Sequence, residues 1–172
     1  NIENQEFALV TIHRDNNTDN SERLTAIVEA LLEITDATKI VLPLHPRTKK
    51  LLPENLSQSL YDKLLNNCNI QIVPPVSFFE IIALEKHSKL IMTDSGGLQK
   101  EAYFFKKPCV ILRPETEWVE IVKNGTGIIA DASKMLIINA FKTLKNGKFN
   151  FSPVFGDGQA SEFILRKTLE TF

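Results

Sequence analysis

The chain has 172 residues, of which 43% are hydrophobic and 24% are charged, and its formal net charge is −1. This composition suits one globular domain with a sizeable core, and the balanced charge disfavours nucleic acid as a partner. No apolar run approaches the roughly 20 residues that a membrane-spanning helix needs. We therefore expect a single domain over residues 1–172, with neither a nucleic-acid nor a membrane partner.

The two cysteines and the first residue bear on the setting of the protein. Cys68 and Cys109 lie far apart in the sequence and lack metal-site spacing, so we expect reduced thiols in a cytoplasmic protein and no bound metal. The chain begins at Asn1 rather than Met, and no signal peptide opens it. We expect it to be a piece of a longer protein.

Short apolar runs alternate with amphipathic stretches along the whole chain. The runs are typical of strands buried on both faces, and the stretches carry apolar residues at helical spacing. Strands are predicted over residues 7–12, 39–44, 69–73, 89–92, 108–112 and 127–130. Helices are predicted from Ser21, over 51–65 with an interruption at Pro53, over 77–87, from Ser95, and over 118–123, 134–145 and 159–169. Residues 15–21 are predicted to form a polar loop. Ser77 and Glu80 predict a capping box at the start of the helix over 77–87.

This alternation predicts a Rossmann-like α/β domain, in which a parallel sheet of about six strands has helices on both faces. In such a sheet ligands bind outside the carboxyl ends of the strands. The chain has neither the dinucleotide fingerprint G-x-G-x-x-G nor the Walker lysine pattern. Polar residues follow four of the predicted strands: His13 and Arg14, His45 and Arg47, Asp94 and Ser95, and Arg113 and Glu117.

The stretch from Thr93 to Glu101 predicts a phosphate site. Gly96 and Gly97 let the backbone approach a ligand closely, and the first amides of a helix lack intrahelical partners and favour an anion. An ordinary helix cap by Asp94 or Ser95 is an equally weighted interpretation, and it is compatible with the first.

Each of the other candidates also has a structural alternative. His13 beside Arg14 suits diphosphate binding or acid–base chemistry. The alternatives are a structural role for His13 and a surface ion pair for Arg14. His45 is a candidate ligand-binding residue, but it precedes a proline in a His-Pro turn, so its alternative role is to fix the conformation of that turn. Glu101 is either a solvated carboxylate or an acceptor for ribose hydroxyls.

Five stretches carry a family resemblance: VTIHR at 10–14, LHPRT at 44–48, TDSGGLQKEA at 93–102, RPETEWVE at 113–120 and GDGQAS at 156–161. With them the chain resembles the C-terminal domain of the non-hydrolysing UDP-N-acetylglucosamine 2-epimerases. That family has two Rossmann-like domains in a GT-B-type arrangement, with the ligand in the cleft. The resemblance implies that this chain is one half of such a fold, without its N-terminal domain, and that the intact protein is a possible homodimer.

The resemblance also implies residue roles. Ser95 and the backbone of Gly96 and Gly97 would meet the diphosphate, and Glu101 would hold the ribose hydroxyls. The uracil would lie near residues 79–83, at Ile81, and the remaining UDP contacts are expected from His45, Arg113 and Glu117. His13 matches the family's active-site histidine and Arg14 its neighbouring arginine. Asn16 departs from the pattern, because the family usually has Glu there.

The implied reaction inverts C2 of UDP-GlcNAc to give UDP-ManNAc, through elimination of UDP and its re-addition, with no cofactor or metal. The family's N-terminal domain supplies the carboxylates proposed for proton transfer at C2. We therefore expect this chain alone to fold and bind UDP weakly without epimerising. The alternatives are a hydrolysing 2-epimerase, an enzyme acting on a diacetamido uronic acid sugar nucleotide, a glycosyltransferase domain, and a non-catalytic nucleotide-sugar-binding module.

Overall fold

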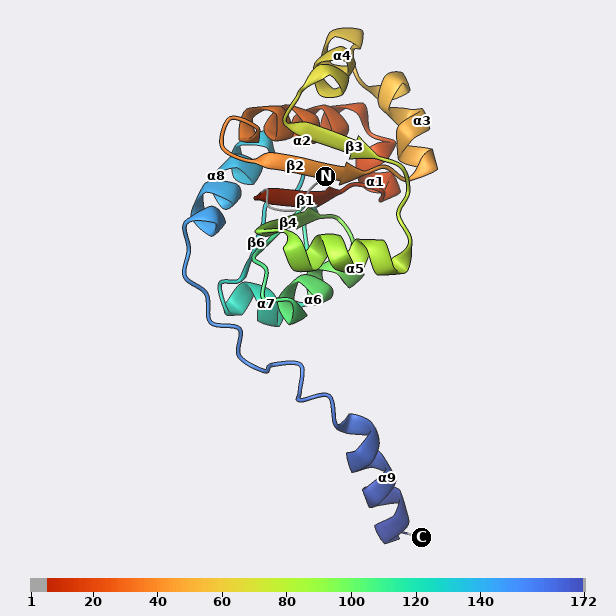
Figure 1. Ribbon diagram of the computed structural model, residues 1–172, viewed down its shortest axis with the longest axis vertical. Coiled ribbons are helices and arrows are strands. Elements are labelled where there is room, and N and C mark those ends of the chain that lie inside the picture. Colours follow the sequence, from red (N-terminus) through yellow and green to blue (C-terminus); the bar gives the residue numbers. More distant parts are fainter. Residues whose placement is uncertain (1–5, 172) are drawn as a thin grey trace.

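All the strands of the sheet run parallel, in the order β3-β2-β1-β4-β5-β6 (Figure 1). The computed structural model describes residues 6–171. The strands are β1 (Phe7–Thr11), β2 (Lys39–Pro43), β3 (Ile70–Val73), β4 (Leu90–Thr93), β5 (Cys109–Ile111) and β6 (Gly127–Ile129). Their parallel arrangement and number confirm the predicted Rossmann-like fold.

The direction in which strands are added reverses at the centre of the sheet. From β1 the chain proceeds outward to β2 and β3, and it then returns to place β4 on the other side of β1. The two central strands are in register, with Leu9 opposite Ile91 and Thr11 opposite Thr93. The crevice outside the carboxyl ends of β1 and β4 is therefore the topological switch point, where α/β sheets bind their ligands.

Helices cover both faces of the sheet because its strands are apolar on both sides. Alternate residues of β1 point to opposite faces: Ala8 and Val10 belong to one buried core, and Phe7 and Leu9 to the other. The first core packs against α2 (Ser21–Ile34), α3 (Pro46–Asn55), α4 (Gln58–Asn66) and α8 (Lys134–Lys145). The second packs against α5 (Phe78–His87), α6 (Gly96–Phe104) and α7 (Val119–Lys123).

Two local predictions are wrong. Part of the predicted loop 15–21 is a helical turn, α1 (Asp15–Thr18), which forms because the amides of Asn17 and Thr18 both donate to the Arg14 carbonyl. Pro53 does not interrupt its helix; it lies inside α3, which begins at Pro46, earlier than predicted. The break falls at the extended residue Leu56, and α4 then starts behind a new cap.

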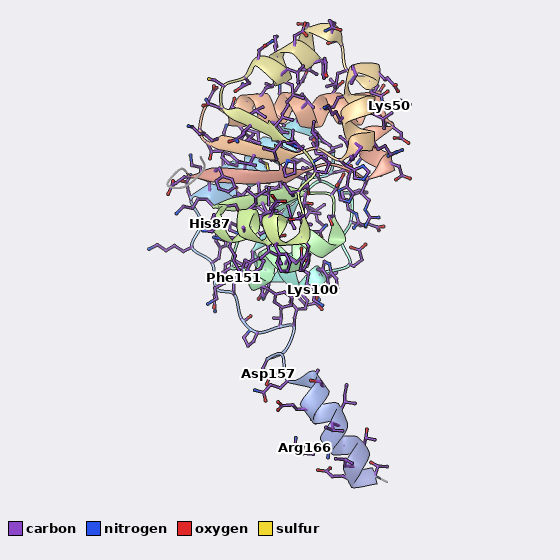
Figure 2. All side chains as sticks on the ribbon, turned by 45° about the vertical axis from the view of Figure 1, so that its right-hand side comes forward. Lys50, His87, Lys100, Phe151, Asp157 and Arg166 are labelled. Carbon is purple, nitrogen blue, oxygen red and sulfur yellow. The ribbon has the colours of Figure 1, made fainter. Side chains whose placement is uncertain are left out.

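The C-terminal part of the chain first packs against α6 and then leaves the body of the domain (Figure 1). The Tyr103 hydroxyl donates to the Ser152 carbonyl at 2.6 Å, and its ring packs edge-to-face with Phe151 and Phe155. The last helix, α9 (Ala160–Thr171), has no buried residue, and its large apolar side chains are exposed. Figure 2 shows Phe151 on the body of the domain and Arg166 on the separate helix.

No helix within residues 6–171 is long and apolar enough to cross a membrane. The capping box at the start of α5 is present as predicted, because the Ser77 and Glu80 side chains each bond the other's backbone amide.

Leu31→Ala should lower the free energy of unfolding by about 2–5 kcal/mol, because it empties part of the core beneath α2. Leu169→Ala on α9 is the matched control, because its side chain is 72% exposed and should change stability by less than about 0.5 kcal/mol. Urea denaturation measures both variants. Equal effects would contradict the placement of α2 over the sheet.

Candidate functional site

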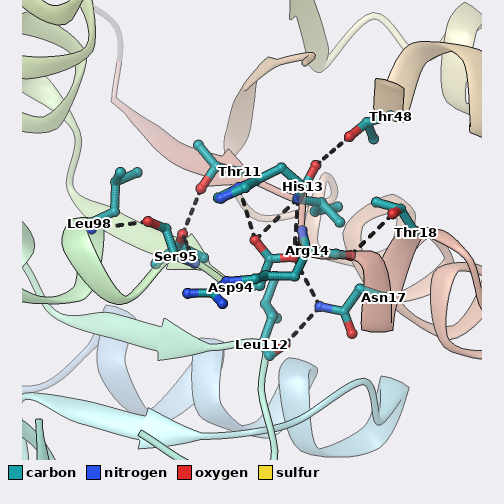
Figure 3. A network of polar contacts seen from close by, with 12 residues as sticks. Thr11, His13, Arg14, Asn17, Thr18, Thr48, Asp94, Ser95, Leu98 and Leu112 are labelled. Carbon is teal, nitrogen blue, oxygen red and sulfur yellow. Dashed lines mark hydrogen bonds and ion pairs between the residues drawn. The ribbon is translucent and has the colours of Figure 1, made fainter. Parts of the chain in front are cut away.

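A buried carboxylate joins the ends of the two central strands. Asp94 follows β4, and its side chain is fully buried. It accepts hydrogen bonds from the backbone amides of His13 and Arg14 at 3.0–3.2 Å and from the Asn17 side-chain amide at 3.1 Å (Figure 3). The His13 ring nitrogen Nδ1 lies 3.2 Å from the same carboxylate. Asp94 therefore fixes the backbone that presents His13 and Arg14.

Two threonine hydroxyls support this junction. Thr11 Oγ1 and Thr93 Oγ1 lie 2.6 Å apart across the central strand pair, and Thr93 Oγ1 also accepts from the Ser95 amide at 2.9 Å. Both threonines are buried. The carboxyl ends of β1 and β4 are thus tied together by side chains as well as by the sheet.

Ser95 is the N-cap of α6, because its Oγ accepts from the Leu98 amide at 3.4 Å. The cap interpretation is therefore confirmed. The Ser95 cap leaves the amides of Gly96 and Gly97 without an acceptor among residues 6–171. These two N–H groups begin the helix at the switch point. Unpaired amides at a helix N-terminus, together with the helix dipole, favour an anion.

A charged pair from the loop after β5 stands beside Gly96. The Arg113 nitrogens Nη1 and Nη2 donate to the Glu117 carboxylate at 2.9 and 2.8 Å, and this bidentate contact lowers the pKa of Glu117. A Cβ on Gly96 would lie 3.2 Å from Glu117 Oε2 and 3.7 Å from Arg113 Nη1. The positive charge of Arg14 also lowers the pKa of Glu117. The rim thus brings Arg14 and Arg113 together near the start of α6.

Arg14 and Arg113 also line one hollow of about 170 Å³, together with Asn16 and Glu115. The hollow brings the loop after β1 next to the loop after β5. The two guanidinium groups and the unpaired helix amides place several hydrogen-bond donors at this corner, and such donors suit a phosphate group. Glu117 and Glu115 offset part of the guanidinium charge.

The other candidates lie further out. The exposed ring of His45 caps α3, where its Nδ1 accepts from the Arg47 amide at 3.2 Å, so its conformational role is confirmed. Thr48 nevertheless ties this turn to the end of β1 by donating to the Ile12 carbonyl at 2.9 Å. Ile81 on α5 is half-buried against the second core. Glu101 is half-buried on the second turn of α6.

The sequence reasoning missed the residues that hold the rim in place. It treated Asp94 as a rim or cap residue, whereas the structure makes it an acceptor for the loop after β1. It gave no role to Asn17, which is buried and also donates to the Leu112 carbonyl at 2.9 Å. Arg23 bonds Asn17 Oδ1 and pairs with Asp131 at 2.5 Å, and that pairing lowers the pKa of Asp131. A buried asparagine in a polar run carries no periodic signal.

No group of three His, Cys, Asp or Glu side chains suited to a metal ion occurs within the part of the chain that the structure describes. Both cysteines are free thiols, as predicted. Cys68 is exposed, whereas burial raises the pKa of Cys109 to about 12, which makes that thiol unreactive.

A parallel sheet with an unpaired helix N-terminus at its switch point is typical of α/β domains that bind nucleotides. The chain belongs to the UDP-N-acetylglucosamine 2-epimerase family, whose model matches residues 1–169. This confirms the resemblance seen in the sequence.

Curated relatives and a solved structure agree with that assignment. The chain is 43% identical over 163 residues to the UDP-N-acetylglucosamine 2-epimerase of Methanocaldococcus jannaschii, covering 94% of this chain and 44% of that protein. It is 44% identical over 160 residues to the UDP-2,3-diacetamido-2,3-dideoxy-D-glucuronate 2-epimerase of Pseudomonas aeruginosa, covering 92% and 43%. A crystal structure of the M. jannaschii enzyme with UDP-GlcNAc and UDP superimposes with a TM-score of 0.86 and 42% identity, covering 96% and 46%. The chain therefore spans less than half the length of these proteins.

Asp94→Asn should lower the free energy of unfolding by about 2–4 kcal/mol, because an amide turns donors toward backbone N–H groups that need an acceptor. Hydrogen exchange of the His13 and Arg14 amides should accelerate more than that of the β2 amides. Asp36→Asn at an exposed position is the control. Unchanged exchange at His13 and Arg14 would show that Asp94 does not hold this loop.

Proposed function

We propose that the chain is the UDP-binding C-terminal half of a UDP-N-acetylglucosamine 2-epimerase. The enzyme interconverts UDP-GlcNAc and UDP-ManNAc in the cytoplasm and serves cell-envelope polysaccharide synthesis. One observation carries the proposal: the unpaired amides of Gly96 and Gly97 open at the switch point, beside Arg14 and Arg113. In this site the diphosphate meets Ser95 and the two glycine amides, and the ribose hydroxyls meet Glu101.

The chemistry of the reaction explains why such a site helps. When the bond between the sugar C1 and the diphosphate oxygen breaks, negative charge grows on the departing phosphate. Fixed amides, a helix dipole and a guanidinium stabilise that charge more strongly than they stabilise the bound substrate. The same groups then retain UDP beside the 2-acetamidoglucal until it adds back to the other face. His13 and Arg14 stand at the same rim and are the catalytic candidates of this half.

The remaining catalytic groups, which transfer the proton at C2, belong to a further N-terminal domain. Two observations support this. The chain matches less than half of each epimerase relative, and α9 exposes Phe163, Ile164 and Leu165 away from the body of the domain. The carboxylates for proton transfer at C2 lie in that N-terminal domain, so the isolated chain binds UDP without turnover. Formation of UDP-ManNAc by the pure chain would contradict this division.

A second substrate has specific support. The P. aeruginosa relative, which is named for a diacetamido glucuronate sugar, is as similar to this chain as the M. jannaschii relative. Both names contain UDP, so the site described above suits either sugar. An assay of the intact protein with both sugar nucleotides decides between them, and release of free sugar would identify a hydrolysing enzyme instead.

Gly97→Ala should weaken UDP binding by about 10–100-fold, because a methyl group would keep the diphosphate away from the helix amides. It should not destabilise the free protein, since the new Cβ would meet only Ser95 Oγ, at 3.7 Å, and alanine favours helix. Met135→Ala is the matched control, because Met135 is exposed at the same position of α8, behind its own serine cap.

Amide NMR titrations with UDP and UMP measure both variants. In the wild type, shifts should centre on residues 95–101 and should be stronger with UDP than with UMP. Equal affinities of Gly97→Ala and Met135→Ala for UDP would contradict the proposed phosphate site.

A further inference from the structure

A second carboxyl group is buried behind the candidate ribose site. Glu85 lies in the last turn of α5, and its side chain is 0% exposed. Neither of its carboxyl oxygens has a hydrogen-bond partner among residues 6–171. An ionised carboxylate in such a place loses its hydration without compensation. The proposed function gives this residue no role.

The group beside it is Glu101 on α6. Burial is the main cause that raises the pKa of Glu85, and the negative charge of Glu101 and its ability to accept a hydrogen bond from the protonated form raise it further, to about 8. Two carboxylates cannot bond each other, since each only accepts. One proton between them gives Glu85 a partner and removes the repulsion.

No cation compensates the pair. Within residues 6–171 neither carboxylate takes part in an ion pair. β1, against which α5 packs, has no ionisable side chain. Most basic side chains on α5, α6 and their following loops have other neighbours: Lys86 lies over the Phe105 ring, His87 meets the Ala83 carbonyl, Lys89 pairs with Glu6, Lys100 lies over the Trp118 ring, and Lys107 is near Lys89. Lys106, in the loop after α6, takes part in no ion pair within residues 6–171.

We propose that Glu85 is protonated at neutral pH and donates its proton in a hydrogen bond to the carboxylate of Glu101. This bond orients Glu101 so that its remaining lone pairs accept the ribose hydroxyls of a uridine nucleotide. Glu85 is thus a positioning residue behind the ribose subsite. The inference rests on the proposed function for its ligand, whereas the shared proton is a property of the free protein.

The shared proton is tested first, without any nucleotide. A pH titration of the glutamate side-chain carboxyl carbons by NMR, with Glu85→Gln to assign the signal, should show one glutamate titrating near pH 8. Titration of Glu85 in the ordinary range of a glutamate, at about pH 4.3, would overturn the inference, even if UDP binds.

Stability supplies an independent readout. The folded protein keeps a proton on Glu85 over a pH range in which the unfolded chain has lost it. Raising the pH from about 4.5 to about 8 therefore favours unfolding of the wild type. Glu85→Gln should lose this part of the pH dependence, and Glu162→Gln on the exposed helix α9 should keep it. Identical slopes for the two variants would overturn the inference.

The role at the ribose is tested by calorimetry at about pH 7.5 and about pH 9. Wild-type affinity for UDP should fall about five- to tenfold between them, following the protonated fraction of Glu85. Glu85→Gln, which still donates, should bind UDP equally at both values. Glu85→Leu, which cannot donate, should bind UDP weakly at both.

The ligand 2′,3′-dideoxyuridine diphosphate lacks both hydroxyls and should show no difference between wild type and Glu85→Gln. The same pH profile for UDP in these two proteins would overturn the positioning role. If the wild type binds no UDP while Glu85 still titrates near pH 8, the proposed function is overturned, and with it the role of Glu85 at the ribose.

Discussion

The geometry of the rim depends on the hydrogen bonds that Asp94 accepts across the switch point. A parallel sheet brings the carboxyl ends of β1 and β4 side by side, but it does not order the loops beyond them. Asp94 supplies that order, since its buried carboxylate holds the backbone of His13 and Arg14 while the next residue caps α6. The loop that carries His13 and Arg14 and the start of α6 are therefore both fixed by the adjacent residues Asp94 and Ser95.

The helix that begins at this loop serves several purposes at once. Its first amides face the switch point, and its second turn carries Glu101. Its outer side packs against Phe151 and Phe155, which belong to the segment that leads to α9. Lys100 lies 4.4 Å from the centre of the Trp118 ring, and the Trp118 indole nitrogen donates to the Gly96 carbonyl at 2.7 Å. These contacts fix the start of α6 from the outside, as Asp94 and Thr93 fix it from the inside. Preorganised donors of this kind stabilise developing charge without having to reorganise.

The sheet was predictable because fully apolar strands and amphipathic helices are local patterns that tertiary packing reinforces. Strand ends and the caps of α5 and α6 followed from single residues such as Ser77 and Ser95. The short helix α1 and the uninterrupted α3 were not predictable in this way: the first needs the buried Asn17, and the second depends on where Pro53 falls relative to an earlier helix start. The partners of Asp94 and the Glu85–Glu101 pair join distant segments. Periodicity carries no information about such contacts.

The central claim is that a uridine diphosphate lies with its phosphates on the start of α6, within the rim that Asp94 holds. A crystal structure of this chain with UDP tests it most directly. We expect phosphate oxygens within hydrogen-bond distance of the Gly96 and Gly97 amides and a guanidinium of the rim, with the ribose hydroxyls at Glu101. A diphosphate bound elsewhere, with the α6 amides facing solvent, would contradict the account.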